Sequence, residues 1–186
     1  MAIKFEEIKK YLSRVARLSI CFSDGHYDNY TMLSDIPDGR YDEYYVYGVG
    51  TVDVEFPLDV YSEPKEMPQR ISMKDGFFLG CGLEIVLTEE ARDIKRTNEN
   101  ELLFGDLRGF LQHGRNFSIV TKEGWEEENF EWRDDIPEKY NRMYVYGIGI
   151  EDNPEALVKL KNVYMVDSRD VKSLRIVVSE RPKELH

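Results

Sequence analysis

Residues 45–50 read Tyr45-Val46-Tyr47-Gly48-Val49-Gly50, and the pattern returns 99 positions later as Tyr144-Val145-Tyr146-Gly147-Ile148-Gly149. The same offset aligns four apolar residues near the start of the chain with four in the second half, namely Phe5, Ile8, Tyr11 and Leu12 with Phe104, Leu107, Phe110 and Leu111. Asp35-Ile36-Pro37 also returns, after a one-residue insertion, as Asp135-Ile136-Pro137. Because the matches keep their order, they predict a tandem duplication with one fold in both halves.

Each half is expected to be an α+β unit, in which a helix is followed by an antiparallel sheet made of a hairpin, a glycine-containing strand and a closing strand. Apolar residues at helical spacing predict the helix, and alternating, β-branched or aromatic runs predict the strands. In the first half these segments are residues 3–15, 18–22, 29–33, 44–54 and 77–87. Their equivalents in the second half are residues 103–112, 117–120, 129–132, 143–150 and 174–180.

The glycine-containing strands, residues 44–54 and 143–150, are expected to be central in their sheets. Glycines at two matched positions predict strands that bend or that another segment approaches closely. The segments that follow differ between the halves. Residues 57–75 are predicted to be a variable loop, whereas within residues 153–170 Pro154 would begin a short helix that extends to Leu160.

The repeats divide the chain into a first unit at residues 1–90, a charged linker at residues 91–101 and a second unit at residues 102–186. A unit of this size buries only a small core by itself. We therefore expect the two units to share an interface or a continuous sheet.

The composition predicts a soluble protein of the cytoplasm. No run approaches the roughly 20 apolar residues of a membrane-spanning helix, so no membrane association is expected, and residues 1–10 lack the apolar core of a secretion signal. Cys21 and Cys81 lie inside apolar runs, where small buried thiols are common, and they form no disulfide framework. A reducing environment is therefore favoured.

The chain is strongly acidic, with 36 Asp and Glu against 25 Lys and Arg and a formal net charge of −11. A surface this negative repels phosphate backbones, so direct DNA binding is not expected. Its natural attraction is to a basic partner. The alternative is that the charge only keeps the protein soluble.

No pattern predicts a catalytic site, a metal site or a cofactor. Histidine occurs only at His26, His113 and His186, none at chelating spacing from another histidine or from a cysteine; the first two are expected in exposed turns. The chain has no nucleophile elbow, phosphate-binding loop or dinucleotide-binding glycine pattern. An enzymatic role is therefore not predicted.

An acidic stretch occurs once in each half and supplies the predicted partner-binding residues. They are Glu123, Glu126, Glu127, Glu128, Glu131, Asp134, Asp135 and Glu138 in the second half, and Asp24, Asp28, Asp35, Asp38, Asp42 and Glu43 in the first.

Three interpretations of these carboxylates are open. They can be a solvated hairpin surface, the Mg²⁺ ligands of a metal-assisted nuclease, or a row of charges that grips a basic protein together with interleaved aromatic side chains. The aromatic residues in question are Tyr27, Tyr30, Tyr41, Trp125 and Trp132. In the third interpretation, charge reversal at Glu126, Glu127, Glu128 and Glu131 weakens partner binding and leaves the fold intact.

Four segments carry a family resemblance, and they are residues 1–12, 35–56, 78–86 and 136–149. The chain resembles small acidic proteins carried on phages and mobile elements of Gram-positive bacteria, a group that includes the type II anti-CRISPR proteins, which inhibit Cas9. The matched motifs are structural, so the resemblance identifies no site residues.

The resemblance implies a protein that binds Cas9, or the Cas9–guide RNA complex, in the cytoplasm of a bacterial host cell and prevents cleavage of target DNA. Inhibition would act on DNA binding, on guide RNA loading or on guide integrity. Cas9 holds nucleic acid in a positively charged channel, so an acidic protein has an electrostatic reason to bind there. The alternatives are a metal-assisted nuclease that acts on the guide RNA and an acidic interaction module of a mobile element with no catalytic role.

Overall fold

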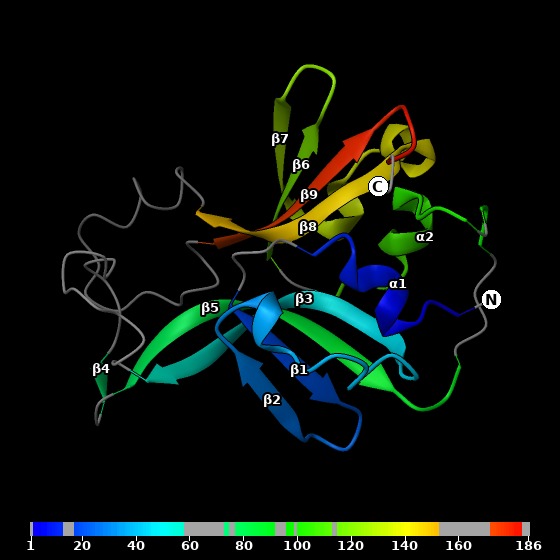
Figure 1. The fold of residues 1–186 in the computed structure, drawn as a ribbon. Helices are drawn as coiled ribbons and strands as arrows, with labels where there is room; N and C mark the ends of the chain where they lie inside the picture. Colours follow the sequence, from blue (N-terminus) through cyan, green and yellow to red (C-terminus); the bar gives the residue numbers. More distant parts are fainter. Residues whose placement is uncertain are drawn as a thin grey trace.

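The computed structural model describes residues 2–12, 17–57, 73–74, 77–91, 96–98, 100–112, 115–152 and 172–183 (Figure 1). The elements of the first unit are α1 (Phe5–Lys9), β1 (Leu18–Phe22), β2 (Tyr27–Tyr30), η1 (Leu33–Asp35), β3 (Tyr45–Pro57), β4 (Met73–Lys74) and β5 (Phe77–Thr88). Those of the second unit are α2 (Phe104–Arg108), β6 (Arg115–Thr121), β7 (Glu126–Trp132), η4 (Arg133–Asp135), η5 (Glu138–Arg142), β8 (Tyr144–Asp152) and β9 (Lys172–Ser179).

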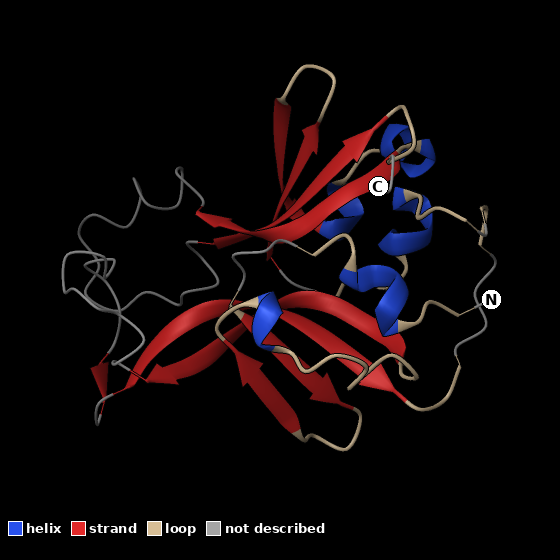
Figure 2. Ribbon diagram, in the orientation of Figure 1, coloured by secondary structure: helices blue, strands red, loops and turns tan. Residues whose placement is uncertain are grey.

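The protein is mostly β, with two similar mixed sheets and a few short helices (Figure 2). The strand order is β2-β1-β5-β3 in the first sheet, where β4 also pairs with β5, and β7-β6-β9-β8 in the second. The hairpins β1–β2 and β6–β7 extend away from each other at opposite ends of the molecule (Figure 1). Two sheets with one strand order are consistent with internal duplication.

The expectation of purely antiparallel sheets is wrong. The closing strands β5 and β9 insert between the hairpin and the glycine-containing strand, where they run parallel to β1 and β6 and antiparallel to β3 and β8. The closing strands are therefore central in the hydrogen-bonded order. The glycine-containing strands lie at the end of that order, contrary to the prediction.

One hydrophobic core contains buried side chains from both units. Ile85 of β5 and Ile176 of β9 are fully buried at equivalent positions, as are Phe5 of α1 and Phe104 of α2. The closing strands were correctly predicted to be buried. Because both units contribute to the same core, burial in one depends on packing from the other.

The two units interlock through the residues that follow each helix. The Ile148 amide of β8 donates to the Tyr11 carbonyl over 2.7 Å, and the Val49 amide of β3 donates to the Phe110 carbonyl over 2.8 Å. Gln112 donates its amide back to Val49. Each unit thus covers the outer edge of the other unit's glycine-containing strand, which confirms the predicted shared interface. The same pairing explains why the helices are shorter than expected, since the chain leaves each helix to join the opposite sheet.

The glycines of β3 are required by this interface. A Cβ at Gly48 would lie 2.9 Å from Gln112 Nε2, and one at Gly50 would lie 2.6 Å from Gln112 Oε1. The predicted close approach to this strand is confirmed, and both glycine-containing strands also carry the predicted irregularity, as a register shift just before Gly48 and Gly147. The Gln112 side chain also hydrogen bonds to Glu84, whose pKa is raised by burial.

Several predictions fall on residues outside the described ranges. They include the helix at residues 154–160, residues 58–72 of the variable loop, and His113 and His186.

No helix in the described part of the chain is long and apolar enough to cross a membrane. Cys21 is a free, half-buried thiol whose pKa is raised by burial.

Candidate partner-binding surface

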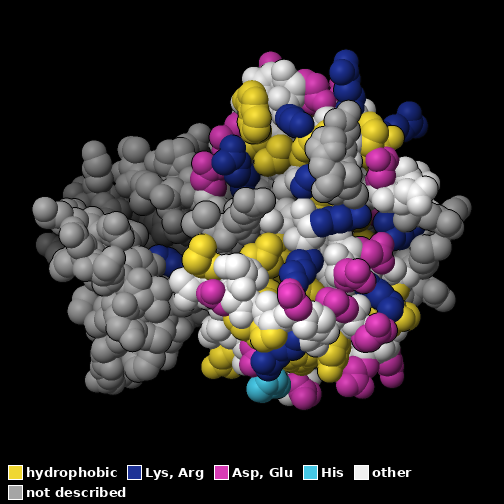
Figure 3. Space-filling model, in the orientation of Figure 1, with side chains coloured by type: hydrophobic (Ala, Val, Ile, Leu, Met, Phe, Trp, Pro, Cys, Tyr) yellow, Lys and Arg dark blue, Asp and Glu magenta, His cyan; other side chains and the backbone are white. Residues whose placement is uncertain are grey.

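The predicted acidic residues do not form one continuous patch. Those of the first unit lie on the β1–β2 hairpin and the loop before β3, and those of the second lie on the β6–β7 hairpin, η4 and η5. The two hairpins point in opposite directions (Figure 1). On the face shown in the space-filling view, acidic side chains are interspersed with Lys and Arg (Figure 3). The negative charge is therefore presented as two separate surfaces.

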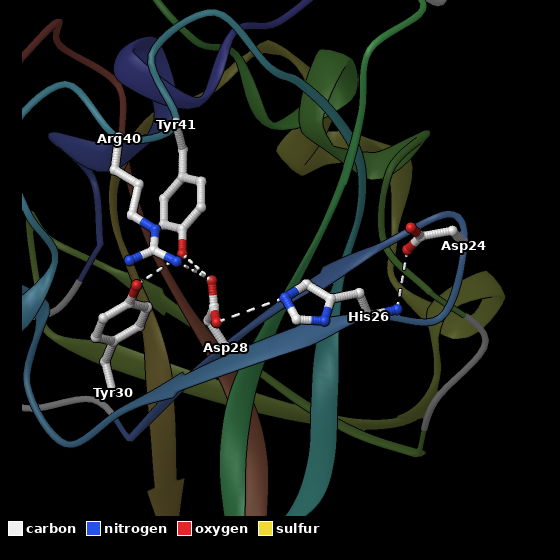
Figure 4. Close-up of polar contacts among 6 residues, drawn as sticks. All are labelled: Asp24, His26, Asp28, Tyr30, Arg40 and Tyr41. Atoms are coloured by element: carbon white, nitrogen blue, oxygen red, sulfur yellow. Dashed lines mark hydrogen bonds and ion pairs between the residues drawn. The ribbon is translucent and has the colours of Figure 1, made fainter.

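Asp28 on β2 is used inside the first unit. Its Oδ2 accepts hydrogen bonds from the Tyr41 hydroxyl at 2.5 Å and from Arg40 Nη2 at 2.9 Å (Figure 4). The hydroxyls of Tyr30 and Tyr41 are 2.6 Å apart. Because Tyr41 gives its only proton to Asp28, Tyr30 is the donor in that bond. His26 Nε2 lies 3.7 Å from Asp28 Oδ1, and its side chain is exposed, as predicted.

The second unit repeats this arrangement with different residues. Glu128 on β7 accepts a hydrogen bond from the Tyr140 hydroxyl at 2.6 Å and one from Lys139 Nζ at 2.5 Å. The cation also lies over the tyrosine ring in both units, with Lys139 Nζ 4.8 Å from the Tyr140 centroid and Arg40 Cζ 5.4 Å from that of Tyr41. Each tyrosine thereby ties its hairpin to the loop that precedes the glycine-containing strand.

The electrostatics of the Asp28–Tyr41 and Glu128–Tyr140 contacts suit a structural role. Burial and the neighbouring carboxylate raise the pKa of Tyr41 and of Tyr140, so both hydroxyls stay protonated. The hydrogen bonds from Lys139 and Tyr140 lower the pKa of Glu128. A carboxylate that is already neutralised by its own chain offers little to a partner, so Asp28 and Glu128 are poor candidates for intermolecular contact.

Two further predicted residues are paired with cations of the same chain. Glu43 is 2.9 Å from Lys4 Nζ, and Asp134 is 3.1 Å from Arg133 Nε. Both carboxylates are mostly exposed. These ion pairs reduce the local negative potential, although surface pairs of this kind remain accessible to competing partners.

Other predicted residues accept hydrogen bonds from uncharged groups. Asp24 and Asp35 accept from backbone amides in the first unit, Glu127 accepts from the Ser118 hydroxyl, and Glu123 accepts from the Ser179 hydroxyl and the Glu180 amide. These bonds hold the carboxylates in fixed positions. Ordered carboxylates are suited to charge-assisted hydrogen bonding with Arg or Lys of a partner.

Within the described residues, six predicted carboxylates have neither a cation nor a hydrogen-bond donor, and they are Glu126, Glu131, Asp135, Glu138, Asp38 and Asp42. Glu126 and Glu131 lie on β7, which is the outermost strand of its sheet. Charges on such an edge also prevent pairing with strands of other molecules. Glu126 and Glu131 are therefore the predicted site residues that the structure leaves most available to a partner.

Trp125, at the apex of the β6–β7 turn, adds an aromatic group to this surface. Its side chain is 66% exposed, and its backbone is left-handed with φ of 52°. Gly25 holds the equivalent left-handed position in the first hairpin, with φ of 87°. This conformation costs a residue with a side chain about 1–2 kcal/mol, and it recurs at the same place in both hairpin turns.

The four residues of the predicted charge reversal are not equivalent in the structure. At Glu128, reversal would place a cation beside Lys139 and remove the acceptor for Tyr140. The interleaved aromatics are also not equivalent, because Tyr41 is buried whereas Tyr27, Trp125 and Trp132 are exposed. The partner-binding prediction is therefore restricted to the unpaired positions.

No group of three or more His, Cys, Asp or Glu side chains that could hold a metal ion is found in the part of the chain that the structure describes. The carboxylates of the acidic stretches bind separate partners along their strands rather than converging on one point. The described residues thus give no support to the metal-assisted nuclease interpretation.

Sequence reasoning missed a cavity beside the β1–β2 turn. It has a volume of about 620 Å³ and is lined by aromatic and acidic side chains of β1, β5 and the segments next to them. Phe22, His26 and Tyr44 were visible in the sequence, but the register that joins the end of β1 to the end of β5 was not. Only that pairing shows that these side chains meet.

Comparison with known proteins gave no match: no protein-family model, no curated protein and no solved structure matches this chain.

Proposed function

We propose that this protein inhibits type II CRISPR immunity by binding Cas9 or the Cas9–guide RNA complex through an acidic surface. The observation that carries the proposal is the β6–β7 hairpin, where no cation among the described residues pairs with Glu126 or Glu131 and Trp125 is exposed at the turn. An exposed aromatic residue is enriched at protein interfaces, and free carboxylates on the same strand can form charge-assisted hydrogen bonds with a basic partner.

The proposed mechanism is obstruction. Cas9 holds nucleic acid in a cationic channel and reads a short DNA motif with arginines. A negatively charged hairpin that enters this region associates quickly because of electrostatic steering, and it then competes with DNA for the same arginines. Disturbance of the guide RNA is a second route to the same outcome.

We also infer that the two units descend from one duplicated sequence. The supporting detail is that the units share more than a strand order. The Tyr41–Asp28 and Tyr140–Glu128 contacts serve the same role with different acidic residues, which is expected when two copies keep a contact while their sequences diverge.

The test is a reconstituted cleavage reaction with Cas9, guide RNA, target DNA and the purified full chain. Binding to the Cas9–guide RNA complex is measured at low and high salt, and we expect tight binding at low salt, weaker binding at high salt, and loss of DNA cleavage. No association at low salt would refute the proposal and favour an acidic interaction module with another partner.

The same reaction separates obstruction from an effect on the guide. The guide RNA is sized after incubation with Mg²⁺ or with EDTA. Intact RNA under both conditions together with lost DNA cleavage supports obstruction. Shortened RNA with Mg²⁺ only would instead support the nuclease alternative.

A further inference from the structure

The cavity beside the β1–β2 turn has one aromatic wall. The Phe22 ring stacks on His26 with centroids 5.8 Å apart and an interplanar angle of 25°, and it meets Tyr44 edge-on at 5.3 Å. All three side chains line the cavity. Aromatic faces attract cations through their ring quadrupole, and the attraction increases as the cation is desolvated.

Three carboxylates complete the cavity. Asp24, Glu89 and Glu90 line it and are exposed, and none of them is paired with Lys or Arg among the described residues. One oxygen of Asp24 accepts a hydrogen bond from the His26 amide, which fixes the carboxylate beside the aromatic wall. The lining therefore combines an apolar surface with carboxylates that no described Lys or Arg neutralises.

The equivalent position in the second unit shows that the fold does not require this lining. Thr88 of β5 and Ser179 of β9 occupy matching positions, opposite Tyr45 and Tyr144. In the second unit, however, Glu123 accepts hydrogen bonds from the Ser179 hydroxyl and the Glu180 amide, and the bond from Ser179, with a smaller effect from Arg181, lowers the pKa of Glu123.

The residues at the positions that line the cavity also differ in type between the two units. By strand register and sequence offset, Thr121, Met143 and Arg181 of the second unit stand where the first unit has Phe22, Tyr44 and Glu90. The aromatic wall and the excess negative charge thus belong to the first unit alone. Phe22 and Tyr44 also pack against the core, but the second unit shows that the same sheet can end without this aromatic and acidic lining.

From this geometry we infer that the cavity binds the guanidinium group of an arginine side chain presented by a protein partner. The planar cation would stack against Phe22 and Tyr44 and donate hydrogen bonds to Asp24, Glu89 and Glu90, an arrangement that matches the fork geometry of arginine better than the point charge of lysine. The assignment of this arginine to Cas9 rests on the proposed function. The inference that the cavity binds an arginine side chain does not depend on it.

The first experiment uses the full chain and a small probe. N-acetyl-arginine amide is titrated while the aromatic and His26 resonances are followed by NMR, with N-acetyl-citrulline amide as the uncharged control of the same shape. We expect saturable shifts of Phe22, His26 and Tyr44 with the arginine probe only. Absence of shifts, or equal shifts with citrulline, would overturn the proposal.

Matched variants identify the carboxylates. The double substitution Glu89→Gln and Glu90→Gln is expected to weaken arginine binding about fivefold or more, because it removes charge-assisted acceptors. Glu180→Gln, at the position equivalent to Glu89, should leave binding unchanged. Equal effects of the two variants would contradict a site confined to the first unit.

A third measurement connects the cavity to the partner. The Glu89→Gln and Glu90→Gln variant is tested for binding to the Cas9–guide RNA complex beside the unmodified protein. A several-fold loss supports an arginine of Cas9 as the occupant, and unchanged affinity overturns that assignment. Failure of the unmodified protein to bind Cas9 would instead refute the proposed function, and the probe titration would still decide the chemistry of the cavity.

Discussion

The two units share a strand order and a tyrosine–carboxylate contact, yet their hairpin ends differ. The first unit ends in an open cavity lined by Phe22 and Tyr44, whereas at the equivalent end of the second unit Glu123 accepts a hydrogen bond from Ser179. The shared features are buried or hold the hairpins in place, whereas the features that differ lie at the ends of the sheets and are at least partly exposed. The comparison teaches that packing has kept the repeat alike and that function is to be sought where the copies diverge.

Separation of the two units is expected to have the largest effect. Residues 1–90 and 102–186, expressed alone, should each fail to show a cooperative thermal transition, because β3 and β8 lose the pairing that Phe110 and Tyr11 provide. Circular dichroism melting measures this, and mixing the two fragments should restore a transition. Independent folding of either fragment would contradict the shared core.

Truncation of the central strands should affect the two units alike. Ile85→Ala and Ile176→Ala each remove a fully buried side chain at equivalent positions, so each should lower the free energy of unfolding by about 2–5 kcal/mol. Chemical denaturation gives both values. A large cost in one unit and almost none in the other would show that the cores are not equivalent.

Removal of the tyrosine hydroxyls should distinguish the units. Tyr41→Phe and Tyr140→Phe each delete a hydrogen bond to a carboxylate, at an expected cost of about 1–3 kcal/mol. Tyr41→Phe should cost more, because its hydroxyl also contacts Tyr30, whereas Phe130 packs against Tyr140 in the second unit. Equal costs, measured by chemical denaturation, would mean that the Tyr30 contact contributes nothing.

The smallest effect on stability concerns pH. The pKa of Glu128 is lowered in the folded protein by Lys139 and Tyr140, so its ion pair stabilises the fold above the usual carboxyl pKa and is lost as the pH falls through the lowered value. Glu128→Gln should therefore destabilise the protein at neutral pH, by less than about 1 kcal/mol because the pair is exposed. The difference from the unmodified protein should vanish in acid, and thermal melting over a pH series checks this.

The sequence predicted where the strands lie along the chain better than it predicted which strands pair with each other. Alternation and β-branched residues located the strands at 18–22 and 77–87, because periodicity reports which face of a segment is buried. Periodicity does not report which strand a segment joins, so the parallel insertion of β5 beside β1 was missed. The helix at residues 3–15 was predicted too long for a similar reason, since residues 11–12 pair with the other unit.

The candidate site was predictable only as a set of acidic positions. Their residue types show the charge, but not that Arg40 and Lys139 neutralise Asp28 and Glu128 across a turn. Those ion pairs depend on how the loop after each hairpin folds back. The same long-range folding creates the cavity at Phe22, which composition and spacing alone could not indicate.

The central claim is that the carboxylates with no cation partner among the described residues bind a basic partner. The most direct measurement is the affinity for the Cas9–guide RNA complex of a Glu126→Lys and Glu131→Lys variant, against a Glu6→Lys and Glu180→Lys control with the same change in net charge. We predict a loss of about tenfold or more for the first variant and a much smaller loss for the control, with unchanged melting of both. Equal losses, or none, would contradict the claim.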